Sequence, residues 1–152
     1  MNDSDFMREA LKEAAAAAAA GEVPIGAVAV KDGVIVARGR NRVEELHSVS
    51  AHAEFQLLHE LEKISGDWRM SDYTFYVTKE PCPMCAGMLI NSRVRRVVFG
   101  TPDPAAGGMG GAFNLNDVPG LLWHCEVTAG ILADESLALI REFFRRRRSS
   151  SK

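Results

Sequence analysis

Two short motifs hold side chains that could bind a metal ion: His52-Ala53-Glu54 and, thirty residues downstream, Pro81-Cys82-Pro83-Met84-Cys85. Two thiolates and one imidazole would give a zinc ion three protein ligands and leave a fourth position for water. That open coordination is typical of catalytic zinc, whereas structural zinc is held by four protein ligands. His47 and His59 flank the first motif, but neither pairs with the cysteines at a matching spacing. The motifs therefore predict a catalytic zinc site, with a thioredoxin-type redox pair as the alternative for the cysteines.

Glu54 is the candidate for proton transfer at such a site. A carboxylate beside a zinc-activated water can take a proton from it and deliver that proton to a leaving group. The alternative is a solvated glutamate in the first turn of a helix, where its charge favours the helix dipole. Only the combination of Glu54 with the three metal-binding side chains favours catalysis.

These side chains can meet only if both motifs begin a helix. Cys82 can serve as the N-cap with Pro83 at the first helical position, which places Cys82 and Cys85 on one face of the first turn. Within a helix, His52 and Glu54 would point about 200° apart, so they can share a site only where their helix starts. Two helix N-termini should therefore converge on the metal, and they should favour thiolates over thiols.

The remaining pattern alternates strands and helices, which suggests one sheet, at least partly parallel, between helix layers. Asp32-Gly33 joins the first two strands as a hairpin turn, and Ser4 could cap the first helix. Residues 41–49 read as a polar loop, and residues 102–116 as a glycine-rich loop that lets another surface come close. Strands are expected over 24–30, 34–38, 73–78, 94–99 and 124–127, and helices over 5–20, 51–63, 83–91 and 133–147.

Length and composition describe one ordinary globular domain of 152 residues. With 47% apolar and 25% charged residues, the chain is neither disordered nor fibrous. No apolar run reaches the 18 or so residues of a membrane span, and the acidic N-terminus is not a signal peptide. Three cysteines argue against a disulfide framework and favour a metal or redox site in a reducing cytoplasm. Of these, Cys125 is expected to be a buried packing residue.

The charge is unevenly distributed along the chain. Residues 141–152 carry six basic side chains and one acidic one, a net charge of +5, so the other 140 residues carry −7 of the total of −2. A basic end on an acidic body is typical of a protein that binds a polyanion, although a solvated, frayed terminus has the same composition. Residues 149–152 are expected to be a disordered tail.

His-Ala-Glu followed by Pro-Cys-x-x-Cys resembles the signature of the cytidine-deaminase-type zinc deaminases. Further blocks, together with Asn41, resemble the bacterial tRNA-specific adenosine deaminases, from about residue 5 to residue 148. These blocks are EVPIGAV (22–28), DWR (67–69), TKEPCPMCAG (78–87), RVVFG (96–100), GIL (130–132) and FFR (143–145). The resemblance implies a three-layer α/β fold, with a mixed five-stranded sheet between helices. It also implies a zinc-dependent hydrolase that converts the wobble adenosine of a tRNA anticodon to inosine.

The resemblance also implies roles for individual residues. One zinc ion per subunit would be bound by His52, Cys82 and Cys85, and Glu54 would move the protons. Asn41 would bond the flipped base or its sugar, although it could also be a turn residue, and Asp103 would touch the neighbouring ribose. The enzyme would be a cytoplasmic homodimer that binds a tRNA anticodon stem-loop through both subunits and does not bind membranes. The other implied substrate contacts are Val23, Pro24, Ala53, Phe143, Phe144 and Arg145, of which Phe144 also fits the core face of its helix.

Three departures from the family pattern leave the substrate open. Ser48-Val49-Ser50 replaces the usual Asp-Pro-Thr, Phe55 replaces a smaller aliphatic residue, and the loop 105–112, with Met109, lacks the usual Lys or Arg and Gly-Ser. The alternative is therefore a deaminase of a free nucleobase or nucleoside such as guanine or cytosine. A third possibility is a zinc-stabilised nucleic-acid-binding module without catalysis.

Overall fold

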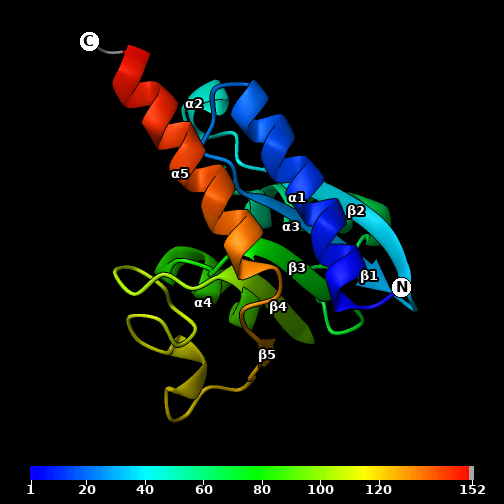
Figure 1. The fold of residues 1–152 in the computed structure, drawn as a ribbon. Helices are drawn as coiled ribbons and strands as arrows, with labels where there is room; N and C mark the ends of the chain where they lie inside the picture. Colours follow the sequence, from blue (N-terminus) through cyan, green and yellow to red (C-terminus); the bar gives the residue numbers. More distant parts are fainter. Residues whose placement is uncertain (151–152) are drawn as a thin grey trace.

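A mixed five-stranded sheet forms the middle layer of the protein in a computed structural model that describes residues 1–150 (Figure 1). The strand order is β2-β1-β3-β4-β5, and β1 is antiparallel to both β2 and β3. The pairs β3–β4 and β4–β5 are parallel, which confirms the expected partly parallel sheet. The strands are β1 (Gly26–Lys31), β2 (Val34–Arg40), β3 (Thr74–Lys79), β4 (Arg96–Thr101) and β5 (Glu126–Thr128).

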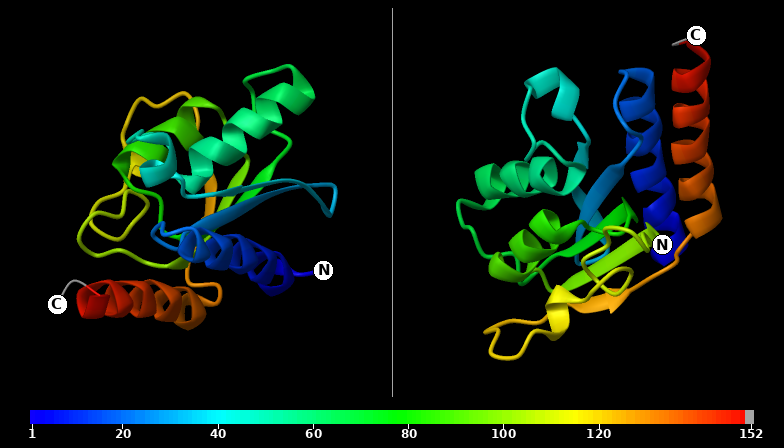
Figure 2. Two further views of the ribbon diagram at one scale, coloured as in Figure 1. Left: turned by 90° about the horizontal axis from the view of Figure 1, so that it is seen from above. Right: turned by 90° about the vertical axis from the view of Figure 1, so that its left-hand side faces the viewer.

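Helices cover both faces of this sheet, as the two views of Figure 2 show. On one face lie α1 (Asp3–Ala19) and α5 (Ala133–Ser150), which contact each other as well as β3 and β4. On the other face lie α3 (Ala53–Ser65) and α4 (Pro83–Asn91), and the short helix α2 (Val43–Leu46) precedes α3. The three layers confirm the predicted deaminase-type fold. No helix within the described residues 1–150 is both long and apolar enough to span a membrane.

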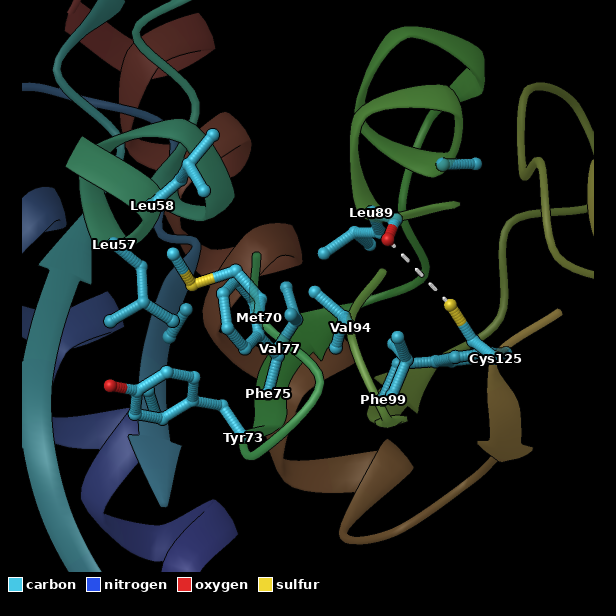
Figure 3. Close-up of a cluster of buried hydrophobic side chains, with 14 of the residues drawn as sticks. Leu57, Leu58, Met70, Tyr73, Phe75, Val77, Leu89, Val94, Phe99 and Cys125 are labelled. Atoms are coloured by element: carbon cyan, nitrogen blue, oxygen red, sulfur yellow. Dashed lines mark hydrogen bonds between the residues drawn. The ribbon is translucent and has the colours of Figure 1, made fainter. Parts of the chain in front are cut away.

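The alternation of side chains along the strands divides the core in two. Phe75, Val77 and Phe99 pack with the leucines of α3 and α4 in the larger cluster, where Cys125 is also buried (Figure 3). The Cys125 thiol contacts the Leu89 carbonyl oxygen at 3.8 Å, so its expected packing role is confirmed. Val28 and Tyr76 point to the opposite face and pack against α1. The period-2 pattern of each strand therefore supplies both layers of the core.

Several local expectations were wrong. Asn2, rather than Ser4, caps α1: its side chain accepts from the Asp5 backbone, while the Asp5 carboxylate accepts from the Asn2 backbone. The expected polar loop contains α2, and the glycine-rich loop ends in a 3-10 turn, η1 (Leu115–Asp117). Ser149 and Ser150 end α5 rather than forming a disordered tail, because the run of arginines continues the helix. Residues 151–152, the rest of that expected tail, lie outside the described residues.

A close approach between β2 and the start of α3 fixes where the first motif lies. A Cβ atom on Gly39 would lie 2.7 Å from the Ala53 carbonyl oxygen and 2.9 Å from the Leu57 nitrogen. Only glycine allows the strand to pass this close to the helix backbone. The first turn of α3 is therefore packed directly on the sheet, which gives the motif a rigid support.

Candidate active site

The two motifs begin helices, as their spacing predicted. His52 is the N-cap of α3 and Cys82 is the N-cap of α4, with Pro83 at the start of that helix. Both caps have extended backbones, and neither side chain makes a capping hydrogen bond to the backbone of its helix. The imidazole and the thiol are therefore free to turn toward each other, between two converging helix N-termini.

The three predicted metal ligands lie together. The His52 Nδ1 atom is 3.6 Å from the Cys82 sulfur and 3.4 Å from the Cys85 sulfur. Tetrahedral zinc, with bonds of about 2.3 Å to sulfur and 2.0 Å to nitrogen, requires S···N separations of about 3.5 Å. The donor set and its spacing therefore fit zinc. Within residues 1–150 this is the single cluster of three such ligands, and no fourth protein ligand joins it.

Hydrogen bonds within the cluster shift the pKa values of its members. A hydrogen bond from the Cys85 thiol, and then one from His52, lower the pKa of Cys82 to about 4. The bond to Cys82, together with burial, raises the pKa of Cys85. The bond to Cys82 also raises the pKa of His52. Of the two thiols, Cys82 is therefore the one that loses its proton more readily. A bound dication would replace the shared protons and favour the expected pair of thiolates.

Glu54 lies in the first turn of α3 and is only 3% exposed. This burial excludes the alternative of a solvated helix-end glutamate. Burial also raises the pKa of Glu54, and the neighbouring His52 and Cys85 partly oppose that shift. A carboxyl group with a raised pKa, beside a cluster that could hold a metal ion, is suited to act as a general acid or base.

A cavity of about 250 Å³ opens beside His52. Val23 and Asn41, both predicted to bind substrate, line it, while the predicted contacts Pro24 and Ala53 are buried and do not. The Asn41 amide donates to the Val23 carbonyl oxygen at 3.3 Å and accepts from the Val43 backbone at 3.3 Å. The asparagine therefore also holds the wall of the cavity in place.

Known proteins match this chain over nearly its whole length. The family model for MafB19-like deaminases matches residues 1–148. The tRNA-specific adenosine deaminase of Bacillus subtilis (strain 168) is 45% identical over 150 residues, which are 99% of this chain and 93% of that protein. The chain belongs to the tRNA-specific adenosine deaminase family.

Solved structures place the deaminase in the same fold. One, from a study of A-to-I editing by tRNA:A34 deaminases at the wobble position of transfer RNA, matches with a TM-score of 0.84 and 37% identity. That match covers 89% of this chain and 98% of the other. A guanine deaminase from Nitrosomonas europaea matches with a TM-score of 0.79 and 27% identity, over 92% of this chain and 83% of the other. The fold therefore carries deamination of more than one purine.

The deaminase holds Asp103 close to the second motif. Its carboxylate lies 3.2 Å from the Lys79 ammonium and accepts from the backbones of Ala105 and Ala106. Burial acts to raise the pKa of Asp103, but the two backbone bonds and Lys79 together lower it. Asp103 therefore stabilises the turn that follows it, in addition to being a candidate substrate contact.

The C-terminal helix α5 of the deaminase reaches the cavity beside His52 through Arg147, whereas the expected substrate contacts in this helix lie elsewhere. Phe144 is 39% exposed, which excludes the alternative that it packs in the core, and Arg145 pairs with Glu142 within α5. Both line a groove along α5 that does not include the metal ligands. Arg147 instead lines the cavity beside His52, with its guanidinium 5.3 Å from the ring of Phe143.

Sequence reasoning missed two further carboxylates in the deaminase site. Glu22 is 1% exposed and accepts from the backbones of Glu44 and Glu45 at 3.0 and 2.8 Å, which fixes α2 over the cavity. Glu80, directly before Pro81, is 3% exposed and binds the glycine-rich loop. The glycines of that loop indicated that another group packs closely against it, but the sequence did not show that this group is the Glu80 carboxylate.

Proposed function

We propose that this protein hydrolyses the wobble adenosine of a tRNA anticodon to inosine and releases ammonia. The observation that carries the proposal is the contact of a buried, protonatable Glu54 with the cluster of His52, Cys82 and Cys85. It is supported by family membership and by relatives whose names specify tRNA adenosine.

His52, Cys82 and Cys85 would hold one zinc ion per chain, with the fourth position left to solvent. When bound, zinc supplies Lewis acidity that lowers the pKa of water from 15.7 toward about 7. The protein's own contribution is to hold three donors at tetrahedral spacing on two rigid helix ends. The open fourth position is what distinguishes this site from a structural zinc module.

Glu54 would carry the protons of the reaction. It accepts one proton from the attacking water as oxygen bonds to C6 of adenine and delivers it to the ring nitrogen. It then takes the remaining proton from the new hydroxyl group on C6 and delivers it to the amino group as the C6–N bond breaks. Water and adenosine thus become inosine and ammonia, and Glu54 ends each cycle in its starting state. Its raised pKa favours the role of proton carrier, because a more basic carboxylate takes up the proton more readily and the acid can then deliver it.

The cavity beside His52 would receive the flipped nucleotide, with Val23 and Asn41 at its wall. Anticodon-loop bases are unpaired, so turning one base outward costs little. The arginines of α5 would bind the RNA backbone, and Asp103 would face the neighbouring ribose. We also propose a homodimer, as the resemblance implies, and a cytoplasmic location, where tRNA is available.

The test is inosine formation by zinc-loaded protein on an adenosine-containing anticodon stem-loop, read by mass spectrometry of the digested RNA. Free bases and nucleosides are incubated in parallel. Inosine at the wobble position alone would support the proposal. Ammonia released from a free base, with no inosine in the RNA, would overturn it.

The second candidate is deamination of a free purine. The match to the Nitrosomonas europaea guanine deaminase and the altered residues 48–50 favour it. Two measurements separate the candidates. Removing the residues after Phe144 should weaken activity on RNA and spare activity on a free base. Rising salt should weaken RNA binding steeply, because phosphate contacts release counterions, and should hardly affect a neutral base.

A further inference from the structure

Glu80 is a buried carboxylate for which the proposed reaction has no direct use. Its Oε1 atom accepts from the Asp103 backbone at 2.9 Å. Its Oε2 atom accepts from the backbones of Met109 and Gly111 at 3.0 and 2.8 Å. One side chain therefore satisfies three backbone donors of the same loop, and hydrogen bonds to a charged acceptor are the strong ones.

The glycine-rich loop is shaped around this carboxylate. A Cβ atom on Gly107 would lie 2.3 Å from the Glu80 carboxyl carbon, and one on Gly111 would lie 2.3 Å from Oε1. Neither position has room for a side chain while Glu80 is in place. The glycines expected to admit a neighbouring surface therefore admit Glu80.

The same loop rests on the metal-binding motif. The Gly108 backbone donates to the Pro81 carbonyl oxygen at 2.8 Å, and a Cβ atom on Gly108 would lie 3.3 Å from the backbone of Cys82. At the other end of the loop, Asp103 pairs with Lys79 at the end of β3. Glu80 thus joins the segment that carries Cys82 to the segment that carries Asp103.

We propose that Glu80 is a positioning residue, which holds the 103–111 loop against the second motif and so fixes the position of Asp103. The proposal rests on the proposed function, in which Asp103 faces the ribose next to the target nucleotide. A carboxylate is required because two oxygens must accept three N–H groups from opposite sides. An amide offers one acceptor and turns two donors toward the backbone.

The decisive variant is Glu80→Gln, which keeps the volume and can satisfy only one side of the loop. We expect hydrogen–deuterium exchange of the 101–113 segment to accelerate by about tenfold or more, as expected for losing a charge-assisted bond. KM for the stem-loop should rise by about tenfold while kcat falls much less, because Asp103 binds the RNA and does not react. The zinc content should stay at one per chain.

Asp3→Asn is the matched control. Asp3 also accepts several hydrogen bonds, from Arg96 and Tyr76, but it does so at the opposite end of β4. We expect this variant to lose stability while its KM and its exchange in the 101–113 segment stay as in the wild type. A rise in KM in both variants would mean that general destabilisation is the cause, and would overturn the positioning role.

A double-variant cycle tests the contact with Gly107. Gly107→Ala alone should disturb the loop, because its new Cβ meets the carboxylate. In a Glu80→Ala background the same change should add little, since the carboxylate is gone. Additive effects would overturn the proposal, as would wild-type exchange and KM in Glu80→Gln.

The exchange measurement separates this inference from the proposed function. Wild-type protein that forms no inosine would refute the proposed function. The exchange of the 101–113 segment in Glu80→Gln and Asp3→Asn would still decide whether Glu80 holds the loop.

Discussion

Arg147 and His52 line the same cavity although 95 positions separate them in the chain. They come from helices on opposite faces of the sheet, α5 and α3. The contact is possible because α5 extends past the ends of the strands toward α2, beside which the cavity opens (Figure 1). Arg147 of the basic C-terminal helix therefore lies at the same cavity as His52, one of the candidate metal ligands.

Arg147→Ala should weaken binding of an anticodon stem-loop by about 5–10-fold, as expected for one phosphate contact. The slope of log Kd against log salt should decrease by about one. Arg145→Ala is the matched control, since Arg145 is equally basic but faces a different groove and pairs with Glu142. Fluorescence anisotropy across a salt series measures both. A larger effect at Arg145 than at Arg147 would contradict the geometry.

Glu54→Gln should keep one zinc per chain and lower kcat by a factor of about 10² to 10⁴, the usual contribution of a general acid–base group. The amide preserves the volume in the buried first turn of α3 but cannot carry a proton. Single-turnover inosine formation measures the rate of the chemical step, and metal analysis of the same sample measures the zinc content per chain. Activity within tenfold of the wild type would remove Glu54 from its assigned role.

Cys85→Ser should abolish stable zinc binding, whereas Cys125→Ser should retain it. Both thiols are buried, but Cys125 lies in the core, where its sulfur contacts the Leu89 carbonyl oxygen. Zinc content after dialysis against a chelator distinguishes the variants. In the wild type, chelation should expose Cys82 and Cys85 to a thiol reagent. Equal zinc loss in both variants would argue against the assigned ligand set.

Asp3→Asn should lower the free energy of unfolding by about 1 kcal/mol at pH 7, allowing for partial exposure of the pair. The hydrogen bond from Arg96 lowers the pKa of Asp3 below its ordinary value of 3.8. A depressed pKa contributes stability above the unfolded value and loses it as the pH falls through the folded value. The difference between wild type and variant should therefore be constant near neutrality and shrink below pH 3.8. Urea denaturation at several pH values tests this, and a constant difference down to the lowest pH would contradict it.

Local chemistry made much of the site predictable. The start of α4 at Pro83 was predicted because proline tolerates the first helical position and Cys82 can precede it as the N-cap. The start of α3 directly after His52 was predicted because His52 and Glu54 can reach one site only where their helix begins. The first cap was missed because Asn2, Ser4 and Asp5 all suit caps, and the choice between them depends on side-chain bonds that spacing does not encode.

Residue types and spacing by themselves determined the alternation of strands and helices and the basic end of the chain, and they predicted the zinc donor set and the proton-transfer residue. Those features depend on contacts between residues that are close in the sequence, or on the charge and metal-binding chemistry of individual side chains. Only the tertiary structure decided that Arg147 rather than Arg145 reaches the cavity, that Glu54 is buried, and that Glu80 is the partner of the glycine-rich loop. Each of these depends on how segments far apart in the chain pack, which is fixed by the layers of the sheet and by the room that individual glycines leave.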